Sequence, residues 1–157
     1  MLSVVKKKGT VFQTGYMYRY NPYVKELMEN IKNGELGEII SVEAQMNCMH
    51  PLEIRRWLDE LPGGIMFFLG CHLVDLILSI QGTPKNIIPL NKNSSGLSED
   101  FGMAVFEYKN GMTGTYITST GEAPGTNRLE ISGDKGKMVL EDGKLKLWKL
   151  REREREF

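Results

Sequence analysis

The chain has 157 residues, 41% of them hydrophobic, and its 20 basic and 20 acidic side chains cancel, which describes an ordinary globular domain that can bury a core without disulfides. Zero net charge provides no field to attract nucleic acid, and the apolar tract 65–80 is broken by polar residues, so we expect no nucleic-acid binding and no membrane insertion. Two cysteines and no recognisable signal sequence predict a reducing, cytoplasmic location.

The first third of the chain combines helical and strand signals. Residues 1–9 are typical of the end of a helix, because lysines precede a glycine that can cap its C-terminus. The β-branched and aromatic residues of 10–18 favour a strand. Asn21 is a good N-cap, and it is followed by proline and by apolar residues at helical spacing, which predicts a helix over 22–33. A second strand is expected over 37–46.

The middle of the chain contains the most apolar predicted helix. Residues 47–62, which include Trp57, have no clear period, and we expect irregular structure there. Residues 65–81 are apolar on nearly every side, which favours a helix buried between layers and closed by Gly82. Beyond residue 83, runs separated by turn-forming residues predict strands at 86–90, 101–108, 113–120, 128–132, 137–140 and 144–150.

Two turn sequences indicate how the later strands connect. Asn110-Gly111 and Asp142-Gly143 tolerate the positive φ angles of tight hairpins, so we expect an antiparallel meander. Helices early and strands late predict an α+β fold: an open, mainly antiparallel sheet with helices packed on one face. The other face would expose apolar side chains, and a homodimer or other homo-oligomer is expected to cover it. The residues assigned to that face are Met103, Val105, Tyr116 and Ile117.

His72 is the first candidate for chemistry, because it lies inside the predicted apolar helix, where an imidazole needs a polar role. Asp75 is three residues away on nearly the same helical face and could hydrogen-bond the imidazole, as a general acid or base requires. The alternative is a structural pair that only holds the helix in place. Residue types alone favour this structural interpretation.

No metal or nucleotide site is predicted. The cysteines and histidines lack the spacing of zinc ligands, and the thiols have no clear activating neighbours beyond those histidines, so both thiols are expected to be inert. These residues are Cys48, His50, Cys71 and His72. Neither G-x-G-x-x-G nor G-x-x-x-x-G-K-[ST] occurs, and we expect no phosphate-binding loop in this chain.

Three motifs follow one another along the first half of the chain. They are Thr14-Gly-Tyr-Met-Tyr-Arg-Tyr-Asn-Pro22, Gly34-Glu-Leu-Gly-Glu-Ile39, and Gly63-Gly64 leading to Gly70-Cys-His72-Leu-Val-Asp75. In order and spacing they resemble the glucose-fructose oxidoreductase/inositol dehydrogenase (Gfo/Idh/MocA) family. Turns at Asn110-Gly111, Ile131-Ser-Gly133 and Lys135-Gly136 extend the likeness over nearly the whole chain. Each motif is weak by itself, whereas the ordered set is fairly specific.

The resemblance implies a division of the chain. Members of the family have an N-terminal Rossmann domain that binds NAD or NADP and carries a catalytic lysine in a Glu-Lys-Pro motif, and neither is found here. Residues 1–18 would be the remnant of the last helix and strand of that domain. Residues 19–157 would be the substrate-binding and oligomerisation domain, similar to the C-terminal domain of glyceraldehyde-3-phosphate dehydrogenase and truncated at its C-terminus. No NAD or NADP is expected to bind this chain alone.

The same resemblance implies roles for single residues. His72 matches the family's histidine beside the reacting hydroxyl, which makes it the catalytic candidate. Asp75 matches a second acidic position, which can contact substrate hydroxyls. Phe68 stands where the family has an aspartate, so one carboxylate is lost and a different substrate or proton relay is implied. The other substrate-binding candidates fall where the family lines its cleft: Arg19, His50 and Trp57.

These observations predict one function and leave two alternatives. The first is the substrate-binding and dimerisation half of an NAD(P)-dependent oxidoreductase acting on a sugar or polyol CH–OH group, with no turnover by the isolated chain. The second is a non-catalytic binding or assembly module, which the carboxylate lost at Phe68 favours. The third is an NAD-dependent glycosidase, because some relatives of the family use the cofactor transiently to cleave glycosides.

Overall fold

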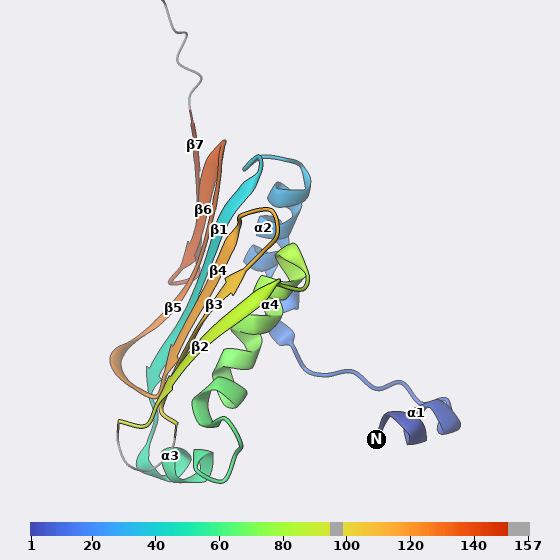
Figure 1. The fold of residues 1–157 in the computed structure, drawn as a ribbon, viewed down its shortest axis with the longest axis vertical. Coiled ribbons are helices and arrows are strands. Elements are labelled where there is room, and N and C mark those ends of the chain that lie inside the picture. The colour runs from blue at the N-terminus through green and yellow to red at the C-terminus, as the bar shows by residue number, and fades with distance from the viewer. Residues whose placement is uncertain (95–98, 151–157) are drawn as a thin grey trace, which may run out of the picture.

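The computed structural model describes residues 1–94 and 99–150, and it places helices on one face of a seven-stranded sheet (Figure 1). The predicted α+β fold class is confirmed. No helix among these residues is long and apolar enough to cross a membrane. The strands are β1 (Ile39–Met49), β2 (Asn86–Lys92), β3 (Phe101–Glu107), β4 (Thr113–Ser119), β5 (Gly121–Gly133), β6 (Gly136–Glu141) and β7 (Lys144–Lys149).

The strand order is β2-β3-β4-β1-β5-β6-β7. The first strand of the chain lies in the centre, parallel to β4 and antiparallel to β5, with Val42 opposite both Gly114 and Ile131. The other neighbouring strands are antiparallel. The predicted meander is therefore wrong at one point, because β1 inserts between two strands that are consecutive in the sequence. A pairing partner so distant along the chain leaves no local pattern to detect.

Both predicted hairpins are present. Gly111, between β3 and β4, has a φ of 84°, and Asp142 and Gly143, between β6 and β7, have φ values of 50° and 68°. Positions that tolerate positive φ let two antiparallel strands reverse within a few residues. These turns set the register of both strand pairs.

The N-terminal segment departs from the predicted strand. Helix α1 (Leu2–Lys8) ends at Gly9 with a φ of 63°, as expected, but none of its residues is buried. Residues 10–16 form no strand, and Val11 is 97% exposed. Side-chain propensity does not make a strand without a neighbour to pair with. The segment ends in the 3₁₀ turn η1 (Met17–Tyr20).

Helix α2 (Pro22–Lys32) begins where the sequence predicts it. The Asn21 side chain accepts hydrogen bonds from the backbone N–H groups of Tyr23 at 2.9 Å and Val24 at 3.4 Å. These bonds satisfy donors that a helix N-terminus otherwise leaves unpaired. The start of α2 is thereby fixed directly after η1.

The segment 47–62 is more regular than predicted. Its first residues extend β1 to Met49, and α3 (Leu52–Leu58) follows. Only Leu58 of this short helix is buried. One buried position gives no hydrophobic period, which explains why the sequence did not indicate a helix.

The apolar tract forms a π-helical turn, η2 (Met66–Gly70), that continues into α4 (Cys71–Gln81) and stops at Gly82. One face of α4 is buried on the sheet through Leu73, Leu76 and Ile77. The remaining residues of α4 are half-buried, and exposure begins at Phe67 of η2, which is 60% exposed. The predicted burial is therefore correct for the side of α4 that faces the sheet and only partial elsewhere.

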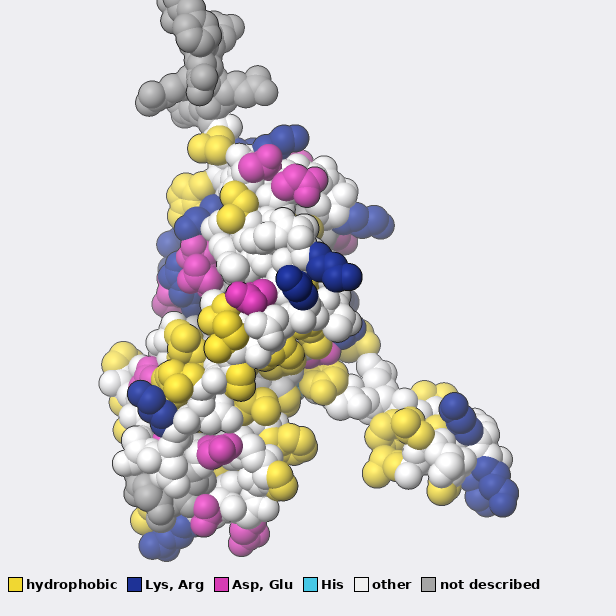
Figure 2. Space-filling model, in the orientation of Figure 1, with side chains coloured by type: hydrophobic (Ala, Val, Ile, Leu, Met, Phe, Trp, Pro, Cys, Tyr) yellow, Lys and Arg dark blue, Asp and Glu magenta, His cyan; other side chains and the backbone are white. Residues whose placement is uncertain are grey.

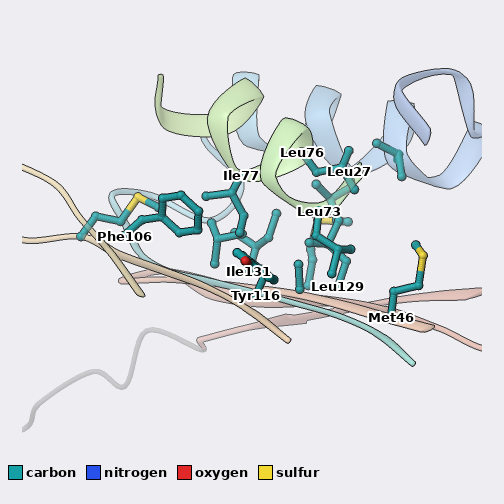
Figure 3. Packing of buried hydrophobic residues seen from close by; sticks show 14 of the residues in the cluster. Leu27, Met46, Leu73, Leu76, Ile77, Phe106, Tyr116, Leu129 and Ile131 are labelled. Carbon is teal, nitrogen blue, oxygen red and sulfur yellow. The ribbon is translucent and has the colours of Figure 1, made fainter. Parts of the chain in front are cut away.

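The core lies between the helices and the sheet (Figure 3). Leu27 of α2 and Leu73 and Ile77 of α4 point toward the strands, where they meet Tyr116 and Ile131. Tyr116 is only 4% exposed and belongs to this helix-covered side. The sequence-based assignment of Tyr116 to the uncovered face is wrong. Consecutive residues of a strand alternate between the two faces, so Tyr116 and Ile117 cannot both lie on the uncovered face.

The other side of the sheet, which we call the open face, has no helix on it (Figure 1). Its half on β2, β3 and β4 is apolar and includes Ile88, Leu90, Met103, Val105 and Ile117, which the strand register places beside one another. Its other half is charged. There Glu130 of β5 forms ion pairs with Arg128 and Lys137.

Candidate functional site

His72 lies on the first turn of α4, and its ring is held between two tyrosines of the segment before α2. The ring centroids are 6.1 Å from Tyr16, edge-on at 90°, and 5.5 Å from Tyr18 at 49°. The Nδ1 atom is enclosed and has no hydrogen-bond partner among the described residues. The other ring nitrogen, Nε2, is not among the enclosed atoms without a partner, and the His72 side chain as a whole is half-buried.

Asp75 does not take the role predicted for it as the partner of His72. Both of its carboxylate oxygens accept hydrogen bonds from Arg19, with Nε donating at 2.6 Å and Nη2 donating at 2.6 Å. This two-point pairing matches the planar guanidinium to the planar carboxylate. The hydrogen bond and the charge of Asp75 raise the pKa of Arg19. Asp75 is 9% exposed, so the charge of Arg19 offsets much of the cost of burying it.

Tyr18 connects the His72 ring to the sheet. Its hydroxyl accepts a hydrogen bond at 2.9 Å from the Asn127 side chain on β5. Sequence reasoning missed Tyr16 and Tyr18 as site residues, although both belong to the tyrosine-rich motif before Asn21. Their spacing suited the predicted strand, and only the folded chain brings them onto α4.

The remaining predicted residues form a second cluster beside α3. Phe68 of η2 packs edge-on against Trp57 at 5.5 Å and against His50 at 5.7 Å between ring centroids. Trp57 keeps 43% of its surface exposed. Nδ1 of His50 is 2.7 Å from Oγ1 of Thr120, a partner 70 residues away for which the sequence has no signal. The cluster presents an apolar, aromatic surface with one imidazole at its edge.

The thiols at this site are not activated. The Sγ atom of Cys48 is 3.4 Å from both ring nitrogens of His50, so it does not lie along the lone pair of either one. Burial raises the pKa of the Cys48 thiol and lowers the pKa of the His50 imidazole, which favours a neutral pair. Burial likewise raises the pKa of the Cys71 thiol. A nucleophilic thiolate needs the opposite electrostatics.

An apolar pocket of about 440 Å³ lies between α4 and the strands β2 and β3. The residues that line it include Tyr16, Phe67, Cys71, Asp75 and Ile87. Figure 2 shows hydrophobic side chains gathered on this side of the molecule, over β2 and α4. Tyr16 therefore separates His72 from an apolar hollow.

Gly70 lets the start of α4 lie close to β4. A Cβ atom at this position would be 3.2 Å from Cγ2 of Thr118 and 3.3 Å from Cγ of Met66. Both contacts are tighter than ordinary van der Waals separations, and Thr118 is fully buried. The height of the His72 turn above the sheet therefore depends on glycine.

The arrangement supports proton or hydrogen-bond chemistry at one imidazole. Among residues 1–94 and 99–150, no group of three or more His, Cys, Asp or Glu side chains could hold a metal ion. His72 lies on the first turn of α4, and Phe68, which packs against His50 and Trp57, lies one helical turn earlier on η2. An imidazole beside aromatic faces can bind a hydroxylated ring by one hydrogen bond and by stacking.

Comparisons with known proteins agree with this fold and with the motif order. The sequence profile of the GFO/IDH/MocA C-terminal domain matches residues 24–139. Trans-1,2-dihydrobenzene-1,2-diol dehydrogenase from Bos taurus is 25% identical over 146 residues, which are 90% of this chain and 43% of the relative. Myo-inositol 2-dehydrogenase from Thermotoga maritima is 24% identical over 153 residues, covering 90% of this chain and 44% of the relative. The chain thus spans less than half the length of these relatives.

Solved structures show the same fold. A levoglucosan dehydrogenase in complex with NADH and L-sorbose superposes with a TM-score of 0.83 at 19% identity, over 98% of this chain and 48% of that one. The WlbA dehydrogenase from Bordetella pertussis, in complex with NADH and UDP-GlcNAcA, gives a TM-score of 0.72 at 19% identity, over 87% of this chain and 46% of that one. Since the profile covers most of the chain, the protein belongs to the Gfo/Idh/MocA oxidoreductase family, of which these residues form the C-terminal domain.

Proposed function

We propose that this chain is the substrate-binding and dimerisation half of an NAD(P)-dependent oxidoreductase acting on a CH–OH group of a sugar or polyol. The observation that carries the proposal is the His72 ring, which packs against Tyr16 and Tyr18 with Nδ1 enclosed, and we infer that the other nitrogen, Nε2, faces the ligand. The relatives named for myo-inositol and glucose 6-phosphate support the substrate class. We place the enzyme in the cytoplasm, in line with two free cysteines.

In this proposal His72 exchanges a hydrogen bond or a proton with the reacting oxygen of the substrate. Trp57 and Phe68 contact the C–H face of the substrate's ring. His50, whose pKa is lowered by burial, hydrogen-bonds a second hydroxyl of the substrate. Asp75 accepts one hydrogen bond from Arg19 on each oxygen and keeps further lone pairs, so in this proposal it can also contact a substrate hydroxyl beside the pocket that it lines. Arg19 is its partner at the same place and also holds the site together.

The residues present do not fit a dinucleotide. Binding of the pyrophosphate needs a glycine-rich turn between a strand and a helix N-terminus. In the described part of the chain, β1 leads into α3 through His50 and Pro51 without a glycine, and α4 continues from η2 without a free N-terminus. NAD or NADP would have to be held by another domain, and the isolated chain is expected to show no turnover.

Ligand-observed NMR tests the proposal on the chain itself. Saturation transfer to myo-inositol, glucose and levoglucosan is measured for the wild-type chain, Trp57→Ala and His72→Ala, and transfer to at least one of these ligands is expected to fall in both variants. Trp148→Ala is the matched control, because Trp148 is a similarly exposed tryptophan on β7. Absence of transfer to every ligand, or an equal loss with Trp148→Ala, would contradict the proposed site.

Dimerisation is the second part of the proposal, and the apolar half of the open face supports it. A second copy would cover Ile88, Val105 and Ile117, whose exposure is unusual for a monomer. Ile88 and Ile87 form a matched pair, since they are 52% and 51% exposed but project to opposite faces of β2. In sedimentation equilibrium, Ile88→Lys is expected to weaken the dimer about tenfold or more, whereas Ile87→Lys leaves it intact. A monomeric wild-type chain at micromolar concentration would refute the proposal.

Phe68 favours a non-catalytic binding module as the second candidate function. Phe68 packs against His50 and Trp57, and its side chain supplies no carboxylate one helical turn before His72. Such a module would keep saturation transfer to its ligand, yet the complete protein would give no NAD(P)-dependent turnover. The two measurements therefore separate the candidates.

A further inference from the structure

Several side-chain contacts attach the segment that carries Tyr16 and Tyr18 to the domain, among them one of 4.0 Å from the Tyr18 hydroxyl to Sδ of Met46 on β1. Arg19 forms the two-point ion pair with Asp75 of α4, the Tyr18 hydroxyl accepts a hydrogen bond from Asn127, and Asn21 caps α2. Two hollows flank the segment: Tyr16 lines the pocket of about 440 Å³, and Tyr18 lines one of about 650 Å³. Loose packing on both sides leaves the segment dependent on these attachments.

The ion pair is the attachment nearest to His72. Asp75 lies three residues after His72 on the same helix, and Arg19 directly follows Tyr18. The Arg19–Asp75 pair therefore joins the tyrosine segment to the helical turn that holds the imidazole. Of the other η1 side chains, Tyr18 packs against the hydrophobic core, whereas Met17 and Tyr20 are 66% and 58% exposed.

Pairing Asp75 with Arg19 also decides how His72 is held. No carboxylate reaches Nδ1 among the described residues, and that nitrogen is enclosed without a partner there. An enclosed N–H without an acceptor is rarer in proteins than an enclosed acceptor without a donor. The proton of the neutral ring is therefore favoured at Nε2, where a ligand can accept it.

We propose that Arg19 is a positioning residue: through Asp75 it holds Tyr16 and Tyr18 against His72, which keeps the neutral imidazole in its Nε2–H form as a hydrogen-bond donor to a ligand oxygen. The His72 ring is then oriented by aromatic packing, whereas a histidine hydrogen-bonded to a carboxylate would be oriented by that hydrogen bond. The inference deepens the proposed function, since the ligand oxygen would be the reacting oxygen of the substrate.

The position of the proton can be read by NMR in the chain as it stands. The chain has only two histidines, so long-range ¹H–¹⁵N correlation at about pH 8.5, where free imidazole is neutral, gives two separable patterns. His72 is expected to show the Nε2–H pattern. A dominant Nδ1–H pattern for His72 would overturn the proposal.

The role of the ion pair is tested with Arg19→Gln, Asp75→Asn and the double variant. Each is expected to remove the NOEs between the His72 ring and the rings of Tyr16 and Tyr18, and to move the His72 ring resonances toward those of an exposed imidazole. The double variant should resemble the single ones, because all three break the same contact. If Arg19→Gln alone unfolds the chain, the double variant is used in its place, because Asp75→Asn removes the buried charge that Arg19→Gln would leave unpaired.

Two references make the result specific. His50 resonances should not move, because His50 contacts Thr120 and Phe68 and not the tyrosine segment. Arg56→Gln, at an exposed arginine of α3, should leave both histidines unchanged. Unchanged His72 NOEs in the folded double variant would overturn the proposal. These readouts need no turnover, so the proposed function can fail while this inference stands, and the reverse.

Discussion

The height of α4 above the sheet is the most sensitive packing feature, and Gly114 tests it. Gly114 lies in β4 directly beneath Ile77, and a Cβ atom added there would be 2.8 Å from Cγ2 of Ile77 and 3.4 Å from Cβ of Phe106. Both side chains are almost fully buried, at 0% and 1% exposure, so neither can move freely. The helix or the strand must shift, and the His72 turn shifts with it.

The expected magnitude combines two opposing effects. Overpacking a close-packed core costs about 1–3 kcal/mol. Replacing glycine by alanine in a strand returns about 0.5–1 kcal/mol, because glycine loses more chain entropy on folding. Gly114→Ala is therefore expected to lower the free energy of unfolding by about 1 kcal/mol, within a range of about 0–2.5 kcal/mol, and each kcal/mol corresponds to a fall of about 2–4 °C in Tm for a chain of this size.

Urea denaturation followed by circular dichroism measures this change. Gly121→Ala is the matched control, since a Cβ atom at Gly121 would meet nothing within 4 Å, and its stability should rise by up to about 1 kcal/mol. Ile77→Ala combined with Gly114→Ala should be less destabilising than the sum of the two single changes, because the smaller side chain on α4 makes room for the new methyl group. If Gly114→Ala were as stable as Gly121→Ala, the packing argument for α4 would be refuted.

Three further predictions concern stability. Asn21→Ala removes the acceptor at the start of α2 and should cost about 1 kcal/mol in urea denaturation, whereas Asn21→Asp should cost much less. Burial lowers the pKa of His50 from its ordinary value of 6.5. Between pH 6.5 and the lower pKa of the folded state, the unfolded chain binds more protons, so the free energy of unfolding should fall as the pH drops through this range. His50→Asn should make the free energy of unfolding less dependent on pH there. Hydrogen bonds from Lys137 and, to a smaller extent, Arg128 lower the pKa of Glu130 from its ordinary value of 4.5. The ionised Glu130 therefore stabilises the fold above pH 4.5, and this stabilisation is lost as the pH falls through the lower pKa of the folded state. Lys137→Met should reduce this loss of stability in acid.

Local signals in the sequence predict local structure well. Asn21 with Pro22 marks the start of α2, and the Asn-Gly and Asp-Gly turns mark two hairpins, because each depends on the conformations of a few adjacent residues. The same holds for the alternation of buried and exposed residues in β3 and β4. Fold class and strand content follow from such signals.

Long-range pairings are outside the reach of these signals. Asp75 and His72 have the spacing of a helical pair, yet Asp75 bonds Arg19, which is 56 residues earlier in the chain. The β-branched segment 10–16 looks like a strand but has no neighbour to complete it among the described residues. Thr120 beside His50 is a third case. The residue types of the site were therefore predictable, while their partners depended on the tertiary fold.

The central claim is that His72 contacts the reacting oxygen, and turnover by the complete enzyme tests it most directly. NAD(P)H formation is measured over a panel of sugars and polyols, with this chain joined to a nucleotide-binding domain of the family, for wild type and His72→Ala. Loss of the hydrogen bond that His72 donates to the reacting oxygen predicts a kcat lower by about 10²–10³ with a smaller change in KM. A His72→Ala enzyme with wild-type kcat on its best substrate would contradict the account.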